Sequence, residues 1–185
     1  MSSTTAPGGE AFVAPLQPAL MRRPLDFLAA ERARQTVLLA HLERLARERR
    51  SRATRGIARA LLRWLAEELP LHLADEEQSL HPRLRPHADP DLLRRLAIEK
   101  GRDRLLAFEV LPGLRRLAGG EPAQEGFAAA ALGFTALHRR HMELEQAEVA
   151  PLARRCLTAQ ALEELAAEMA ARRTGGTRTP CPTAP

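Results

Sequence analysis

The sequence predicts an all-α protein: an up-down-up-down four-helix bundle with a short fifth helix and disordered tails. Alanine, leucine, arginine and glutamate dominate the chain of 185 residues, and such a composition is typical of helical proteins. Apolar side chains recur at helical spacing along four long segments, and the connections between these segments are short. Short connections make sequential helices antiparallel neighbours, so the four segments are expected to form one bundle.

The first two long helices are expected over residues 24–49 and 54–84. Pro24 suits the opening turn of the first helix, because its fixed φ angle matches a helix and its missing N–H is not needed there. A proline inside a helix removes a hydrogen bond, so Pro70 is expected to interrupt the second helix. Pro82 and Pro86 are expected to end it.

The third and fourth long helices are expected over residues 90–119 and 122–156. Asp89 is a suitable N-cap for the third helix, and the proline after it suits the first helical position. The third helix is expected to bend or break at Pro112 and Gly113 and to stop at the next pair of glycines.

These elements divide the chain into four parts. We expect a disordered segment at residues 1–22, the bundle at 23–156, a short C-terminal helix at 157–173 and a disordered tail at 174–185. The stretch "MRRPLDFL" leaves Met21 open as an alternative start.

Composition argues against several classes of function. The formal net charge is +5 and the sequence pI about 10.7, but the arginines are scattered among glutamates, and aromatic residues, which stack on bases, make up only 3%. Nucleic acid is therefore not expected as a partner. No apolar run approaches the roughly 20 residues that span a bilayer, so no membrane is expected either. The two cysteines make no disulfide framework and no secretion signal opens the chain, which indicates a reduced, cytoplasmic protein.

One pattern of ionisable residues occurs twice. The stretches "LHLADEEQSLHPRL" and "HMELEQAEVAPL" both read His-x-x-x-Glu-x-x-x-(Leu/Val)-x-Pro, with His72 and Glu76 in the first and His141 and Glu145 in the second. Each pair lies one helical turn apart on an apolar stripe, so both side chains of a pair reach the same point in the core. His138 lies on the same stripe as the second pair.

Such a pattern predicts either a metal site or a charge network. A buried carboxylate is costly unless a cation or a metal lies beside it. Neutral imidazole together with carboxylate suits iron, manganese or zinc. The order and spacing differ from the Glu-x-x-His motif of ferritin-like di-metal proteins. No phosphate loop, nucleophile elbow or cysteine-rich zinc pattern occurs, so no enzymatic activity is indicated.

Four segments in order carry a resemblance to the hemerythrin-like (HHE cation-binding) domain family: "RPLDFLAAERARQ", "LPLHLADEEQSLHPRL", "LLRRLAIEKGRD" and "HRRHMELEQAEVAPLARR". The resemblance covers about residues 24–155 and implies a non-heme di-iron site. It implies that His72, Glu76, His141 and Glu145 match ligand positions. It also implies binding of oxygen or another small diatomic ligand, or a role in sensing oxygen, iron or redox stress.

Two positions depart from the family pattern. Where the first and third helices of the family supply a histidine, this chain has Arg32 and Lys100, which is its only lysine. Arginine cannot be deprotonated to ligate a metal, and lysine ligates only when its pKa is strongly lowered. Three alternatives stay open: an iron site, a reduced single-metal site with His138 as a possible extra ligand, and a metal-free helical interaction module in which the two cations balance Glu76 and Glu145.

The other polar residues are expected to have structural or surface roles. His81 and His87 flank prolines and are expected at the surface, and His41 is expected to make a solvated polar contact. Asp103 lies nearly one turn after Lys100 and is expected to pair with it.

Overall fold

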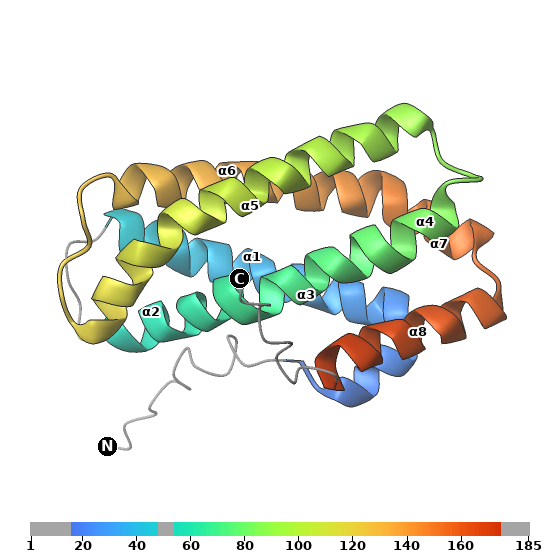
Figure 1. Cartoon of the computed structure of the whole chain (residues 1–185), viewed down its shortest axis with the longest axis horizontal. Helices are drawn as coiled ribbons and strands as arrows, with labels where there is room; N and C mark the ends of the chain where they lie inside the picture. The colour runs from blue at the N-terminus through green and yellow to red at the C-terminus, as the bar shows by residue number, and fades with distance from the viewer. Residues whose placement is uncertain (1–15, 48–53, 175–185) are drawn as a thin grey trace, which may run out of the picture.

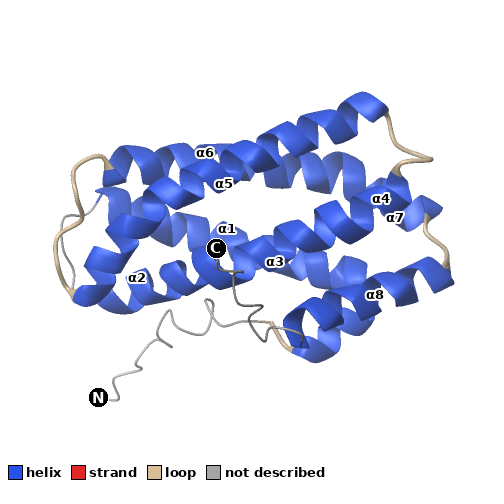
Figure 2. Cartoon of the chain, in the orientation of Figure 1, coloured by secondary structure: helices blue, strands red, loops and turns tan. Residues whose placement is uncertain are grey.

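The computed structural model describes residues 16–47 and 54–174, and all regular structure in these ranges is helical (Figure 2). Four long helical segments lie side by side, and a fifth helix lies alongside them near one end (Figure 1). The elements in chain order are η2 (Pro18–Arg22), α1 (Pro24–Arg47), α2 (Thr54–Arg63), η3 (Trp64–Glu68), α3 (Leu69–Ala74), η4 (Asp75–Leu80), α4 (His81–Leu84), α5 (Pro90–Gly119), α6 (Phe127–Leu144), η5 (Glu145–Val149), α7 (Ala150–Cys156) and α8 (Ala159–Thr174). The all-α bundle predicted from the sequence is therefore confirmed.

Internal prolines do not break the second and fourth segments. Residues 54–84 form one continuous helical path through α2, η3, α3, η4 and α4, which corrects the expected interruption at Pro70. Each of the three π-helical turns, η3, η4 and η5, comes just before a proline: Pro70, Pro82 and Pro151. A proline lacks an N–H and its ring clashes with the preceding turn, and a wider i→i+5 turn accommodates both.

The helix α5 is also continuous, so of the expected bend or break at Pro112 and Gly113 no break occurs. Its ends follow the sequence: Asp89 Oδ1 accepts a hydrogen bond of 3.0 Å from the Asp91 N–H, and Gly120 adopts the left-handed conformation that ends the helix. Gly113 packs directly against the ring of Phe127, where any side-chain carbon would clash. The fourth segment begins at Phe127 rather than at residue 122.

The ends of the described chain differ from the predicted disorder. Residues 1–15 and 175–185 lie outside the described residues, but Pro18–Arg22 form a 3₁₀ helix, η2, within the segment predicted to be disordered. Met21 in η2 is buried in a cluster that includes Leu165 and Met169 of α8. Two arginines also hold α8 to the second segment, because Arg172 and Arg173 pair with Asp75 at 2.8 Å and 2.6 Å.

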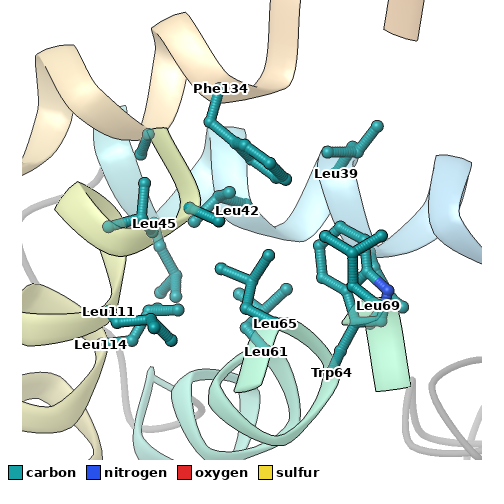
Figure 3. Packing of buried hydrophobic residues seen from close by; sticks show 14 of the residues in the cluster. Leu39, Leu42, Leu45, Leu61, Trp64, Leu65, Leu69, Leu111, Leu114 and Phe134 are labelled. Atoms are coloured by element: carbon teal, nitrogen blue, oxygen red, sulfur yellow. The ribbon is translucent and has the colours of Figure 1, made fainter. Parts of the chain in front are cut away.

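Two apolar clusters form the core, and a polar layer separates them along the helices. One cluster surrounds Trp64 and Phe134, as Figure 3 shows, and the other includes Leu28 and Leu96. Every long segment contributes to both clusters and has buried charged or polar residues between its two apolar parts. The packed clusters on either side therefore fix the height at which these polar side chains meet.

Candidate metal centre

The two His-x-x-x-Glu motifs face each other across the polar layer. His72 lies in α3 and Glu76 in the π turn η4. His141 lies in the last turn of α6, and Glu145 is the first residue of the π turn η5. All four side chains are buried, as their shared apolar stripes predict. The π turns η4 and η5 contain Glu76 and Glu145, and each is followed by a proline. The recurring proline is therefore part of what orients the motif.

Glu76 is surrounded by cationic groups. Its Oε2 lies 2.8 Å from Lys100 Nζ, and its Oε1 lies 3.2 Å from both Arg32 Nη1 and His72 Nε2. Burial by itself raises the pKa of Glu76, but Lys100 and His72 overcome it and hold the pKa well below its ordinary value. Glu76 is therefore an ionised carboxylate, and Arg32 and Lys100 reach it as their positions on the sequence predict.

Glu145 shares the same lysine. Its Oε1 lies 3.3 Å from Lys100 Nζ and 2.9 Å from His81 Nε2. Burial and the nearby Glu76 raise its pKa, but Lys100 and His81 lower it below the ordinary value. His81 was expected at the surface, and this expectation is wrong. The i→i+5 turn η4 brings the residue five positions after Glu76 back toward the core.

His72 behaves as a cation. Its Nδ1 lies 2.8 Å from Glu31 Oε2, and its Nε2 faces Glu76. Burial lowers the pKa of His72, but the two carboxylates outweigh burial and raise it to about 10. With Glu31 and Glu76 as its partners, the ring of His72 therefore carries a proton on both nitrogens at neutral pH.

His138 belongs to a separate hydrogen-bonded group. Its Nδ1 lies 2.9 Å from Asp103 Oδ2, and its Nε2 lies 2.9 Å from Gln35 Oε1. Burial lowers the pKa of His138 more than Asp103 raises it. The expected pairing of Asp103 with Lys100 is therefore wrong, because Asp103 pairs with His138 from α6 instead.

His141 differs from the other buried histidines. Its Nε2 lies 3.5 Å from Glu76 Oε2 and 3.9 Å from Glu145 Oε1. Within the described part of the chain, both ring nitrogens of His141 lack a hydrogen bond of normal geometry. Oε2 of Glu145 lacks one as well. Ligand atoms of Glu76, His141 and Glu145 all lie within 4.8 Å of one another.

This donor set fits one cation and does not fit two. Three donors converge, but His72 is engaged elsewhere, and Arg32 and Lys100 already supply two positive charges. Among the groups in contact around Glu76 and Glu145, the carboxylates Glu31, Glu76 and Glu145 are matched in number by Arg32, Lys100 and protonated His72 without a metal. A buried network of this kind is stable only when each charge has its partner.

The remaining histidines lie outside the layer. His87 is exposed, as expected, and His41 Nδ1 lies 3.1 Å from Arg44 Nη2 near the surface. Neither is placed to reach the carboxylates of the layer.

Comparison with known proteins identifies one family. A model described as the hemerythrin HHE cation-binding domain matches residues 23–153, which include all four long helical segments and the polar layer. No curated protein and no solved structure matches the chain. In the ranges that the structure describes, no helix is both long enough and apolar enough to cross a membrane.

Proposed function

This chain belongs to the hemerythrin HHE cation-binding domain family, and we propose that in this member a lysine ammonium takes the place of metal at the centre of the bundle. In this proposal the protein is a metal-free helical interaction module whose former metal site is an Arg/Lys–Glu charge network. Cation binding is the role that the family match supports, and the charge network is the change specific to this chain.

The observation that carries the proposal is the position of Lys100. Its ammonium is fully buried and lies within 3.3 Å of both Glu76 and Glu145. Burial lowers the pKa of Lys100, but the two carboxylates raise it above its ordinary value, so the side chain stays charged. Two unit charges 4 Å apart interact by about 4 kcal/mol at an effective dielectric constant of about 20, and a dication doubles that repulsion. The ammonium therefore opposes a metal at the same carboxylates.

Metal analysis of the whole chain tests this proposal. We expect protein purified anaerobically from iron-replete cells to contain well below one ion of iron, manganese or zinc per chain. The Arg32→His, Lys100→His double variant removes both cations and adds two imidazoles, so we expect it to take up more iron. The matched control is Arg139→His with Arg140→His, two arginines that do not contact Glu76 or Glu145. Two ions per wild-type chain, or a folded double variant with no more iron than wild type, overturn the proposal.

A second candidate function is the binding of a single cation. The convergence of Glu76, His141 and Glu145 favours it, because His141 and Glu145 keep donor atoms without normal hydrogen bonds in the described part of the chain. Iron is the ion that the family resemblance suggests, with oxygen or another small diatomic molecule as ligand and sensing of oxygen, iron or redox stress as the role. One ion per wild-type chain that is lost in His141→Gln and kept in His41→Gln supports this candidate over the first.

A further inference from the structure

The outward face of α5 carries large apolar side chains. Ile98 is 51% exposed, Leu105 67% and Phe108 71%. Together with Gly101 and Pro112, they repeat at intervals of three and four residues along α5. This is the spacing of the seam by which one helix packs against another. Helices of the bundle cover the opposite face of α5, so this stripe has no partner within the described chain (Figure 1).

A groove extends the apolar surface beside the stripe. It has a volume of about 360 Å³ and lies between α5 and the second helical segment. Phe108 stands at its edge, and Leu65, Leu69 and Leu73 lie on its other side. Contiguous exposed apolar side chains of this kind are typical of interaction sites.

The charges that flank the stripe are self-complementary. Arg102 follows Gly101 and Glu109 follows Phe108, so the two exposed charges occupy equivalent positions seven residues apart. When two copies of α5 lie antiparallel with Leu105 of each opposite Phe108 of the other, Arg102 of each copy faces Glu109 of the other. One two-fold axis then forms two identical ion pairs.

The antiparallel arrangement fits better than a parallel one. Parallel helices would place Arg104 beside Glu109 of the other copy, but Arg104 is already paired with Glu77. In the antiparallel register Gly101 of each copy lies opposite Pro112 of the other, and Ile98 lies opposite the exposed Arg115, whose aliphatic stem can cover it, so the contact spans residues 98–115. Interfaces of this small size are at the weak, reversible end of the known range.

We propose that the stripe Ile98, Gly101, Leu105, Phe108 and Pro112 is a homodimer interface, in which α5 packs antiparallel on α5 of a second copy. The inference deepens the interaction role proposed above by naming the partner. It depends on the outer face of α5 and not on the contents of the polar layer. Metal analysis and oligomeric state are therefore separate readouts, and failure of one is distinguishable from failure of the other.

Sedimentation of the full chain over a concentration series tests the interface. Wild type should pass reversibly from monomer to dimer as concentration rises. The variant Phe108→Glu should raise the dimer dissociation constant at least about tenfold, as expected for a buried aromatic anchor. Circular dichroism should show an unchanged fold, because Phe108 is mostly exposed. The control variant Glu163→Arg changes an exposed charge on α8 and should dimerise like wild type. A wild type that stays monomeric, or a dimer that survives Phe108→Glu, overturns the proposal.

A charge exchange tests the antiparallel pairing. Arg102→Glu alone and Glu109→Arg alone each bring like charges together, so each variant should dimerise more weakly than wild type. An equal mixture of the two variants should form heterodimers as tight as the wild-type dimer, since every facing pair is then opposite in charge. The double variant Arg102→Glu, Glu109→Arg should dimerise with itself. A mixture no tighter than its components overturns the antiparallel arrangement.

Discussion

The two copies of the His-x-x-x-Glu motif share their spacing but differ in their surroundings. In the first copy, His72 lies between Glu31 and Glu76, and Arg32 reaches Glu76 from α1. In the second copy, both nitrogens of His141 lack a normal hydrogen bond within the described residues.

The difference comes from the neighbouring helices. The motif places each histidine and glutamate at the centre of the bundle, but α1 and α5 supply Glu31, Arg32 and Lys100, which contact the first copy more than the second. The histidine of the first motif copy is consequently paired through both ring nitrogens, whereas both ring nitrogens of the second histidine lack a normal hydrogen bond among the described residues. Lys100 joins the two copies, because its ammonium lies near a carboxylate of each.

Among the variants considered, removing the Lys100 ammonium should lower the free energy of unfolding most, because it contacts both copies of the motif. We expect Lys100→Met to lower the free energy of unfolding by about 3–5 kcal/mol at neutral pH, because Glu76 and Glu145 lose a shared buried cation. Denaturant titration measures it. The control Arg104→Met breaks the exposed pair with Glu77 and should cost less than about 1 kcal/mol.

Acid should reduce this loss. The folded-state pKa of Glu76 is depressed, so the ionic stabilisation is present above the pKa of the unfolded state and is lost as pH falls through the folded value. In Lys100→Met a glutamate takes up a proton at higher pH, and the difference from wild type should shrink at low pH. Equal stability of variant and wild type at neutral pH contradicts the buried ion pair.

His72 should stay protonated well above the ordinary pKa of a histidine. The folded-state pKa of His72 is raised to about 10, so its stabilisation is fully present below the unfolded value of about 6.5 and is lost as pH rises through about 10. Relative to His72→Gln, wild type should lose about 4 kcal/mol of stability between pH 6.5 and pH 10. NMR titration of the ring should show His72 protonated at pH 8. A neutral His72 at pH 8 contradicts the cation assigned to the first copy.

Glu76 and Glu145 should contribute unequally to the free energy of unfolding. Glu76→Gln leaves Lys100, Arg32 and His72 without their common partner, whereas Glu145→Gln leaves Lys100 paired with Glu76. We therefore expect Glu76→Gln to be more destabilising than Glu145→Gln by about 2 kcal/mol, measured by denaturant titration at neutral pH. Equal losses would mean that the two copies carry the same share of the charge network.

Helical periodicity was sufficient to place most of the polar layer. It put Arg32, Lys100 and the two motifs on stripes that face one point, because buried faces of regular helices follow the 3.6-residue repeat. It failed at Asp103, whose partner His138 lies on another helix. Predicting whether Asp103 pairs with Lys100 or with His138 requires the relative height of α5 and α6 in the bundle. The sequence of a single helix does not give this height.

The π turns account for the errors at Pro70, Pro82 and His81. Pro70 and Pro82 were expected to interrupt and end a helix, since a regular α-helix does not tolerate them. The structure widens the preceding turn instead, and the helix continues. The signal was present, because a proline stands six residues after the glutamate in both motif copies, at Pro82 and Pro151. A repeated proline beside a buried carboxylate indicates a π turn there.

The smallest effect should come from His81, which only the π turn brings to the second copy. His81 Nε2 lies 2.9 Å from Glu145 Oε1, and this contact helps to lower the pKa of Glu145. Glutamine in its place keeps a hydrogen-bond donor but removes the imidazole, so we expect His81→Gln to cost about 1 kcal/mol at neutral pH. His87→Gln is the matched control, because His87 is exposed and lies beyond the turn, and it should leave stability unchanged. If both variants unfold at the wild-type denaturant concentration, His81 does not contribute to the second copy, and Lys100 alone compensates Glu145.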